Sequence, residues 1–502
     1  MESKSSTHGL RYTIATYLFQ ILLGLTFFFA FASLLPQMHT LIGKNGIIPI
    51  TDFVVAAHGS MDLHNFPTLL QFFNSDFTIF AVVAFGAIFS LLLIFGILPR
   101  LSLICCFVLY LSIVVAGRDF FYFQWDNLLL EASFIAFFMP LRSWKRPVSE
   151  PNGLLVFLFR WLLFRLYFES GIAKLLYGQG TWLNLSAMKY YYETAPLPSF
   201  GGWLAQQLLP GFIHELTAIL VFAAELIVPF AFFLPQKFRR MRIAAFYITA
   251  GFNAILAFTS NYGFFNFLSS ALGIFLLDDQ HIRFLAGKIG RLLRVKQLSS
   301  SLDQIKISSS GSRIGFYFLV AFAIVSVPFS VAEFTGFAKS GIKYSAVVGK
   351  VVDAYTPYRI INIYHLFPGI VRERIVPEIS GSADGVNWKP FLFKYTPNDP
   401  KSMPPWLPMY QARFAFQYSF LTLGQVNSQY FSNLVAKLCN SPQQLNSILA
   451  ENPFNKENPQ QLKLDFYRYK FSKPADLIKN KVWWTKEYAG SMQGTIKCNS
   501  SQ

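Results

Sequence analysis

The sequence predicts a mainly α-helical polytopic membrane protein with about eight or nine transmembrane helices, followed by a C-terminal extracytoplasmic α+β domain that contains a small β-sheet or sandwich. Composition predicts the first part, because 53% of the 502 residues are hydrophobic and only 14% are charged, whereas a soluble protein carries about 25% charged residues. The basic residues lie in short runs between apolar segments, which is typical of cytoplasmic loops. The same pattern argues against nucleic-acid binding, although the formal net charge is +17.

Each transmembrane helix is predicted from an apolar stretch of membrane length. The first stretch follows Arg11 and is interpreted as an uncleaved anchor. We expect nine crossings if residues 243–278 form a short helical hairpin that breaks at Asn261, Tyr262 and Gly263. The predicted spans cover residues 12–36, 77–98, 101–117, 120–141, 153–177, 213–234, 243–278 and 314–334.

The basic runs also predict how the chain is oriented. With nine crossings, each main basic cluster, including the loop at 281–313, falls on one side of the membrane. The N terminus is then cytoplasmic and everything after Ser340 is extracytoplasmic, while the aromatic segment 178–212 lies at the outer surface. We therefore predict a transmembrane domain at 1–340 and a C-terminal extracytoplasmic domain at 341–502.

The C-terminal domain is predicted from a change of pattern. Residues 371–396 alternate polar and apolar side chains and contain Gly381 and the pair Asp384-Gly385, which predicts strands joined by a hairpin. Helices are expected at residues 410–423, 428–450 and 474–481.

The cysteines leave open whether the C-terminal domain contains a disulfide, and the histidines argue against a metal site. Cys439 and Cys498 are either joined by a disulfide, if this domain faces an oxidising compartment, or both free. The seven histidines are scattered along the chain, without the spacing of a metal site. We therefore expect neither a metal nor another cofactor.

Four charged residues, Arg160, Arg165, Glu169 and Lys174, lie inside the predicted helix at 153–177. A charge at membrane depth costs about 2.5–3.5 kcal/mol even on the most lenient scale, so such residues have partners or a function. We expect this helix inside a bundle, with Arg165 and Glu169 on one face and the other two charges on the opposite side. The predicted intramembrane polar cluster comprises Asp126, Asn127, Glu131, Arg160, Arg165, Glu169, Lys174 and Glu225.

This cluster has two interpretations. Its members are either buried ion pairs that fix how the helices pack, with Asp126 or Glu131 opposite Arg165 or Arg160, or they form a substrate or catalytic site. Glu193, in the outer segment, lies either over the mouth of a cavity that reaches Lys174 or in an interfacial aromatic belt.

A series of motifs resembles, in order along the chain, the lipase maturation factor family. The membrane part contains WDNLLLE, FRWLLFRLYFESGIAKL, YYETAPLP and NYGFFN, and the C-terminal part contains SADGVNWKPFLFKYTPNDP, MPPWLPMYQARF and FYRYKF. One run departs from the family, because Arg413, Phe414, Ala415, Phe416 and Gln417 stand where the family has an Arg-Leu-Asp-Trp-Gln-like run. This departure puts any contact of that aspartate in doubt.

The resemblance implies a membrane-resident factor that assists the folding and maturation of secreted proteins. In animals such factors act on homodimeric lipases in the endoplasmic reticulum, and a bacterial member would lie in the inner membrane. The implied partners are membrane lipids and a secreted client protein. This role is chaperone-like and requires no catalytic residue.

A second, shorter likeness supplies the alternative function. Tyr167, Phe168, Gly171, Lys174 and Trp182 are similar to the membrane region of vitamin K-dependent carboxylases, in which a lysine at the position of Lys174 acts as a base. The alternative is therefore a membrane-embedded enzyme that acts on a lipid- or quinone-like substrate. Lys174 would be its base, with Glu169 as a second catalytic candidate.

The sequence also suggests where a client would bind. Aromatic side chains on the C-terminal domain either form an exposed contact surface or belong to the core of that domain. These client-contact candidates are Trp406, Phe414, Phe416, Tyr418, Trp483 and Trp484.

Overall fold

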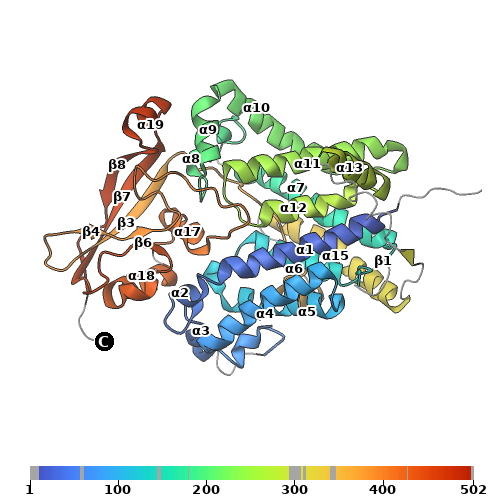
Figure 1. The fold of residues 1–502 in the computed structure, drawn as a ribbon, viewed down its shortest axis with the longest axis horizontal. Coiled ribbons are helices and arrows are strands. Elements are labelled where there is room, and N and C mark those ends of the chain that lie inside the picture. The colour runs from blue at the N-terminus through green and yellow to red at the C-terminus, as the bar shows by residue number, and fades with distance from the viewer. Residues whose placement is uncertain are drawn as a thin grey trace, which may run out of the picture.

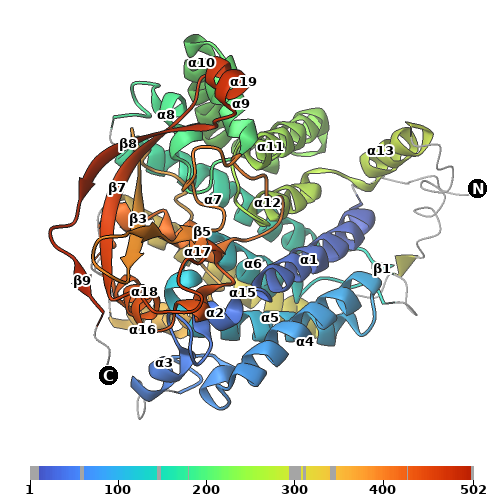
Figure 2. The same ribbon diagram turned by 60° about the vertical axis from the view of Figure 1, so that its left-hand side comes forward.

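The computed structural model comprises a bundle of helices and a C-terminal part built on a twisted β-sheet, which lies at one end of the bundle (Figures 1 and 2). The structure describes residues 11–56, 62–143, 148–178, 180–292, 307–308, 313–339, 346–426 and 428–498.

Six helical segments, among the residues that the structure describes, are long and apolar enough to cross a membrane. Five of them begin and end close to predicted spans, and the sixth, Gln236–Thr259, overlaps only the first half of the hairpin predicted at 243–278. We therefore describe an integral membrane protein with six candidate spans, and the count of eight or nine crossings stays a prediction. The six segments are Thr13–Leu34, Asp76–Phe95, Pro99–Ala116, Gly211–Phe233, Gln236–Thr259 and Gly315–Ala338.

The first 340 residues contribute further helices that are shorter or carry more charge. The helices of this part are α1 (Thr13–Leu34), α2 (Met38–Ile42), α3 (Ile50–Ala56), α4 (Asp76–Phe95), α5 (Pro99–Ala116), α6 (Gln124–Ala136), α7 (Gly153–Tyr177), α8 (Ala187–Thr194), α9 (Phe200–Leu208), α10 (Gly211–Phe222), α11 (Arg239–Thr259), α12 (Phe265–Gly273), α13 (Asp279–Leu292) and α15 (Arg313–Ala338). Two short strands, β1 (Val148–Ser149) and β2 (Ile307–Ser308), pair in parallel.

The span predicted at 120–141 was too long. Its helix, α6, begins at Gln124 because Phe123 has an extended backbone, and it ends at Ala136. Pro140 lies just beyond that end, and a proline disfavours helical geometry in the residue before it. With 13 residues, α6 is too short to cross a bilayer alone.

The charged helix α7 lies inside the bundle, as predicted. It packs against α6, α12, α15 and the π-helical turn Ala223–Ile227 that continues α10. This wide turn precedes Pro229, which has no N–H to donate to the carbonyl of Glu225. The turn brings Glu225 against α7.

The predicted break in the hairpin at 243–278 is also present. Helix α11 ends at Thr259 and α12 begins at Phe265. Gly263, between them, has a φ of +54°, a conformation that glycine adopts without steric cost.

The C-terminal part contains a five-stranded antiparallel sheet in the order β4-β3-β7-β8, with β9 also paired to β7. The predicted hairpin is formed by β3 and β4, and Gly385 in its turn has a φ of +76°. A separate pair of strands, β5 and β6, lies beside this sheet. The strands are β3 (Arg374–Ser382), β4 (Lys389–Pro390), β5 (Leu392–Phe393), β6 (Leu449–Glu451), β7 (Gln461–Phe471), β8 (Trp484–Ser491) and β9 (Ile496–Lys497).

Two of the helices predicted in this part are shorter than expected. The range 410–423 contains only α17 (Arg413–Tyr418) and a 3-10 turn, and the range 428–450 contains α18 (Gln429–Asn440). Helix α18 ends at Asn440 because Pro442 follows it. The others are α16 (Ala346–Tyr355) and α19 (Pro474–Asn480), the latter at its predicted place.

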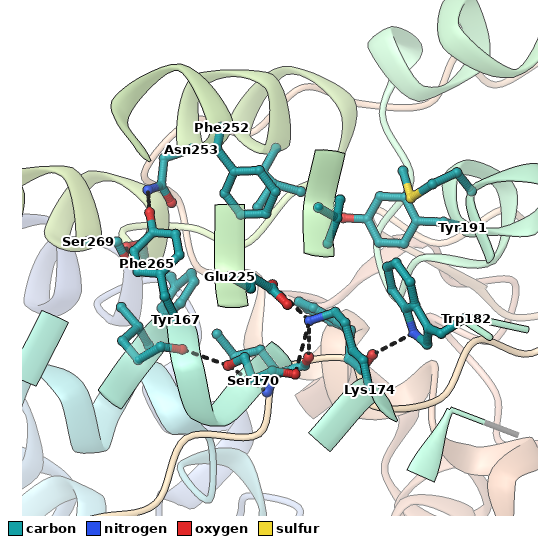
Figure 3. Close-up of a pocket in the computed structure, with 16 residues that line it drawn as sticks. Tyr167, Ser170, Lys174, Trp182, Tyr191, Glu225, Phe252, Asn253, Phe265 and Ser269 are labelled. Carbon is teal, nitrogen blue, oxygen red and sulfur yellow. Dashed lines mark hydrogen bonds and ion pairs between the residues drawn. The ribbon is translucent and has the colours of Figure 1, made fainter. Parts of the chain in front are cut away.

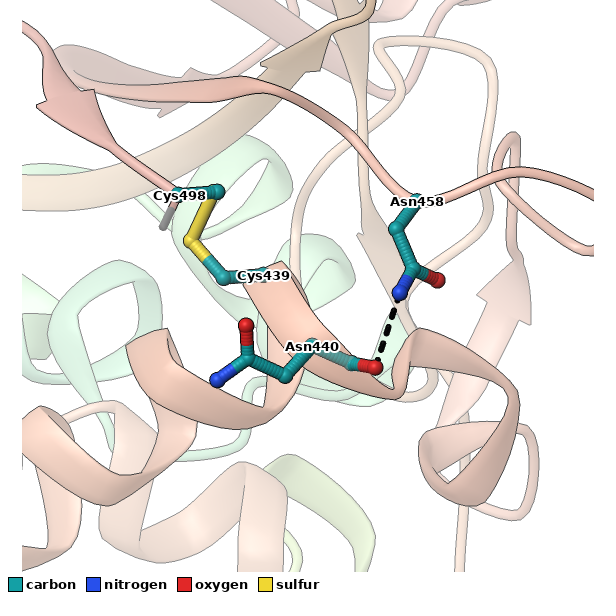
Figure 4. The surroundings of a disulfide bond; sticks show 4 residues. All are labelled: Cys439, Asn440, Asn458 and Cys498. Atoms are coloured by element: carbon teal, nitrogen blue, oxygen red, sulfur yellow. Dashed lines mark hydrogen bonds between the residues drawn. A yellow bond between two sulfur atoms is a disulfide. The ribbon is translucent and has the colours of Figure 1, made fainter. Parts of the chain in front are cut away.

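A disulfide joins Cys439 of α18 to Cys498 after β9 (Figure 4). Of the two alternatives that the sequence left open, the structure has the bonded one. Beside it, the side chain of Asn458 donates a hydrogen bond of 2.8 Å to the carbonyl of Asn440. The bond fixes the segment after β9 against α18.

Candidate functional site

The charged residues of α7 hold an extended segment, residues 360–367, which we call the strap. The strap has neither helical nor strand structure, so its backbone groups need partners from elsewhere. Glu169 accepts a hydrogen bond of 2.8 Å from the Tyr364 N–H, and Ser170 Oγ accepts one of 3.2 Å from the Leu366 N–H.

Cationic and aromatic donors at and beyond the C-terminal end of α7 complete this arrangement. Lys174 Nζ donates to the carbonyl of Leu366 at 2.9 Å, and Trp182 Nε1 donates to that of Phe367 at 3.2 Å. From the other side, the Gln124 side chain of α6 accepts from the His365 N–H at 2.9 Å. The strap is thus held between α6 and α7 by side chains that pair with its backbone.

Arg165 and Glu131 form a buried ion pair beside the strap, one of the pairings that the sequence suggested. Arg165 also donates to the carbonyl of Asn362 at 2.8 Å. Glu131 accepts from the Asn362 side chain at 2.9 Å and from the Tyr364 hydroxyl at 2.8 Å. The two charges therefore have hydrogen-bonding partners as well as each other, which offsets part of the cost of burying them.

Lys174 and Glu225 form a second buried pair, with 2.8 Å between Nζ and Oε1 (Figure 3). The ammonium group also lies 5.3 Å from the centre of the Trp182 ring. The pair faces a mainly apolar cavity between α7, α8, the α10 segment, α11, α12 and the strap. Side chains that line this cavity and are labelled in Figure 3 are Tyr167, Ser170, Lys174, Trp182, Tyr191, Glu225, Phe252, Asn253, Phe265 and Ser269.

Asp126 of α6 and Arg413 of α17 form a third buried pair, between the membrane part and the C-terminal part. Arg413 donates to both carboxylate oxygens, at 2.8 and 3.0 Å. It also donates to the Tyr110 hydroxyl at 3.0 Å and the Phe120 carbonyl at 2.9 Å, and it lies over the Phe121 ring. The C-terminal part is therefore joined to α5 and α6 by a fully enclosed guanidinium group.

Five of the eight members of the predicted polar cluster lie in these three ion pairs, with Arg413 as the sixth partner, and three members lie in none of them. Arg160 lies apart from Lys174 and donates to the Tyr12 hydroxyl at 2.7 Å and the Phe275 carbonyl at 2.9 Å. Asn127 is half-buried next to Asp126 and belongs to none of the three pairs. Glu169 accepts a hydrogen bond from the strap and belongs to none of the three ion pairs.

Sequence reasoning did not find Arg413, Asn362, Tyr364 or Gln124 as members of these networks. Arg413 was noted only as part of a run that departs from the family pattern. A weak signal existed, because an arginine among four apolar or aromatic neighbours requires a partner when buried. Nothing in the spacing indicated that this partner lies on α6.

The aromatic client-contact candidates are mostly buried. Phe414, Phe416 and Tyr418 are each 2% exposed, and Trp484 is 3% exposed. The other alternative, the core of the C-terminal part, applies to Phe414, Tyr418 and Trp484. Phe416 instead packs against Trp125 of α6. Trp483 packs against Trp203 of α9. These five do not form the exposed contact surface considered above.

Trp406 differs from the other five candidates because it is 49% exposed. Its indole N–H donates to the carbonyl of Ala257 on α11 at 2.7 Å. Trp406 therefore lies at the rim between the two parts of the protein.

Glu193 connects α8 to the sheet. Its carboxylate accepts a hydrogen bond of 2.7 Å from the Phe471 N–H, and its carbonyl accepts one of 2.7 Å from Arg374. Burial raises the pKa of Glu193 and lowers that of Arg374 to about 10. Glu193 is not among the residues that line the cavity at Lys174, and its carboxylate is bonded to β7.

These features define a class of protein: an integral membrane protein whose C-terminal part is joined to the bundle by buried ion pairs and a strap. The chain belongs to the lipase maturation factor family. Residues 14–284 match the model of the lipase maturation factor transmembrane domain. Residues 360–494 match that of the lipase maturation factor C-terminal domain, and this second match begins at the strap.

Curated relatives match over nearly the whole chain. Lipase maturation factor 2 of Xenopus tropicalis is 28% identical over 91% of this chain and 79% of its own length. Human lipase maturation factor 2 is 29% identical over 92% of this chain and 80% of its own length. Mouse lipase maturation factor 1 is 27% identical over 93% of this chain and 84% of its own length. No solved structure matches the chain significantly.

Proposed function

We propose that this protein is a membrane-resident factor that assists the maturation of a secreted lipase. The observation that carries the proposal is the match to lipase maturation factors over both parts of the chain, at 26–29% identity. The strap and the pairing of Arg413 with Asp126 support it further, because they hold the C-terminal part in one position on the bundle, where it can present a surface to a client.

The location of the protein is part of the proposal. We infer that the N terminus is cytoplasmic and that the C-terminal part is extracytoplasmic, in the endoplasmic reticulum of a eukaryotic host or at the inner membrane of a bacterial one. The disulfide between Cys439 and Cys498 supports this orientation, because disulfides persist in oxidising compartments.

Orientation can be tested with a single exposed thiol. Val386 lies in the hairpin turn after β3 and is exposed, so Val386→Cys provides a label in a chain whose free Cys105 and Cys106 are replaced by serine. We expect an impermeant thiol reagent to react from the lumenal or periplasmic side of sealed vesicles. Reaction from the cytosolic side alone would overturn the orientation.

Trp406 is the remaining candidate for client contact among the six aromatic residues. Its indole is partly accessible at the rim between the two parts, and an exposed tryptophan is a typical anchor in protein interfaces. We propose that a client docks at this rim.

The enzymatic alternative, with Lys174 as a base, is not favoured. The Nζ atom of Lys174 already donates to Glu225 and to the Leu366 carbonyl. In this arrangement its hydrogen bonds support the strap, and the curated relatives carry the name of maturation factors.

Maturation can be measured in cells that co-express this protein and a secreted lipase. We expect the specific activity of the secreted lipase, per amount of lipase antigen, to rise with the wild-type protein. Trp406→Ala should reduce this gain while the variant accumulates normally in the membrane. Phe212→Ala, at an exposed position on α10, is the matched control and should retain it. An unchanged specific activity with well-folded protein present would contradict the proposal.

A further inference from the structure

Helix α13 lies at the end of the bundle opposite the C-terminal sheet (Figures 1 and 2). Its first residue, Asp279, accepts hydrogen bonds from the N–H groups of Thr13 and Ile14, at 3.0 and 2.9 Å. The preceding residue, Asp278, forms an ion pair with Arg239 at the start of α11. Because α1 and α11 belong to candidate spans, α13 begins at the level where two spans leave the membrane.

The sequence of α13 is amphipathic. Apolar residues at the spacing i, i+3, i+4 and i+7 form one side of the helix, and residues spaced by four form the opposite side, which is basic. A basic amphipathic helix of this kind lies in the plane of a membrane surface when its apolar side reaches lipid. The apolar side comprises Ile282, Leu285, Ala286 and Ile289, and the opposite side comprises Arg283, Gly287 and Arg291.

The bundle covers only part of the apolar side of α13. Ile282 and Ala286 are 5% and 7% exposed, and the helix packs against α1. Beside them, Leu285 is half-buried, Ile289 is 45% exposed and Phe284 is 58% exposed. Phe284, Leu285 and Ile289 form what we call the exposed strip.

The exposed strip adjoins the side of α11 that faces lipid. His281 Nε2 lies 2.8 Å from the Tyr247 hydroxyl of α11, and the ring of Phe284 lies 5.8 Å from that of His281. Tyr247 and its neighbour Ile248 are 46% and 48% exposed. Because α11 is part of a candidate span, its exposed apolar side chains contact acyl chains. The strip therefore lies where the bilayer surface meets the bundle.

Basic side chains accompany the strip. Lys288 and Arg291 are exposed on α13, and Lys237 and Arg240 are exposed at the same end of the bundle. Residues 280–292 contain no acidic residue. Lysine and arginine beside a membrane are attracted to anionic lipid head groups, and their stems can lie along apolar surface while the charge stays in water. Charge and apolar pattern thus both fit an anionic bilayer surface.

We propose that α13 lies in the surface of the bilayer and binds anionic phospholipids. Phe284 and Ile289 insert among the upper parts of the acyl chains, Lys288 and Arg291 contact the phosphate groups, and the side that contains Gly287 faces water. A soluble protein partner would have to bind a strip that adjoins lipid, so the structure favours the bilayer. The proposal rests on the position and pattern of α13 and not on the maturation function.

Two labelled variants test where α13 lies. Ile289→Cys and Gly287→Cys each carry one environment-sensitive fluorophore in the full-length protein, reconstituted in nanodiscs, with Cys105 and Cys106 replaced by serine. A Cβ at Gly287 meets no neighbouring atom within 4 Å, so this position is the matched control. We expect phospholipids brominated near the head group to quench the label at 289, and iodide in solution to quench the label at 287. Equal access of iodide to both labels would overturn the proposal and leave the strip to a soluble partner.

The basic residues are tested with the label at 289. A rising fraction of phosphatidylglycerol in phosphatidylcholine nanodiscs should protect this label from iodide. Lys288→Gln with Arg291→Gln should lower the ratio of inserted to exposed label by about fivefold for each charge removed. Lys473→Gln with Lys479→Gln, two exposed lysines at and next to α19, is the control and should leave the ratio unchanged.

Two further outcomes would overturn the proposal. Insertion that does not depend on phosphatidylglycerol would remove the role of anionic head groups. Glycerol 3-phosphate in solution should not protect the label in nanodiscs of phosphatidylcholine alone. If it did, the helix would bind free phosphate rather than a bilayer.

Discussion

Arg413 and Asp126 meet in the interior of the protein although 287 residues separate them along the chain. Both side chains are fully buried. Arg413 belongs to α17 of the C-terminal part, and Asp126 belongs to the first turn of α6. This pair, together with the strap on α7, makes the position of the C-terminal part depend on charges buried in the bundle.

Removal of one member of this pair should destabilise the whole protein. Asp126→Ala leaves the guanidinium group of Arg413 buried without a counter-charge, which costs about 3–5 kcal/mol. We expect a lower thermal midpoint, lower yield in the membrane and greater protease sensitivity of residues 346–498. The midpoint of the detergent-solubilised protein is the primary measurement.

Two controls distinguish the effect of breaking a buried ion pair from the effect of removing any charged side chain. Lys189→Ala removes the partner of Glu215 in an ion pair that is about half exposed, and such a pair contributes about 0–1 kcal/mol. The double variant Asp126→Leu and Arg413→Met should recover much of the lost stability, because no unpaired charge remains. If Asp126→Ala behaved like Lys189→Ala, the pair would have no role in joining the two parts.

The strap should depend on its hydrogen bonds to Glu131. Tyr364→Phe removes one hydroxyl donor and leaves that carboxylate partly unsatisfied, with an expected cost of about 1–3 kcal/mol. Hydrogen exchange of the peptide that contains residues 360–367 should accelerate. Tyr488→Phe, at an exposed position of β8, should change stability by less than about 0.5 kcal/mol. Unchanged exchange in Tyr364→Phe would show that the strap does not depend on the Tyr364 hydroxyl.

The pattern of apolar and charged residues in the sequence predicted two features of the helix bundle correctly. The burial of α7 followed from its four charges, and the break between α11 and α12 followed from Asn261, Tyr262 and Gly263. In both cases the signal is local, because the cost of a charge in lipid or the conformational freedom of glycine acts at the residue itself.

The partners of those charges could not be predicted in the same way. The strap has no periodic pattern, since its backbone is paired with side chains rather than with a neighbouring strand. Asn362 and Glu131 are 231 residues apart, and Arg413 is farther still from Asp126. Composition also failed to separate core from surface in the C-terminal part, where Phe416 packs against Trp125 of α6 instead of facing a client.

The disulfide should contribute to the stability of the C-terminal part. It closes a loop of 59 residues, for which the chain-entropy relation gives ~4 kcal/mol. Cys439→Ser, or reduction of the wild type, should therefore lower the thermal midpoint and change mobility on a non-reducing gel. Cys105→Ser alters a free thiol and serves as the control. If reduction left the midpoint unchanged, the bond would add nothing to folding.

The hairpin turn at Asp384 should be sensitive to acid. Its carboxylate accepts hydrogen bonds from the N–H groups of Asn387 and Val386, at 2.8 and 2.9 Å, and these hold its pKa below the ordinary value of 3.8. A lowered pKa means that the folded turn favours the charged form, so its stabilising effect is fully present above pH 3.8 and is lost as the pH falls through the lower folded value. Asp384→Asn keeps the acceptor but removes the charge. Hydrogen exchange of residues 383–390 should therefore be faster in the variant at pH 7, and the two proteins should converge in acid. A difference that persisted or grew below the folded pKa would show that the charge does not stabilise the turn.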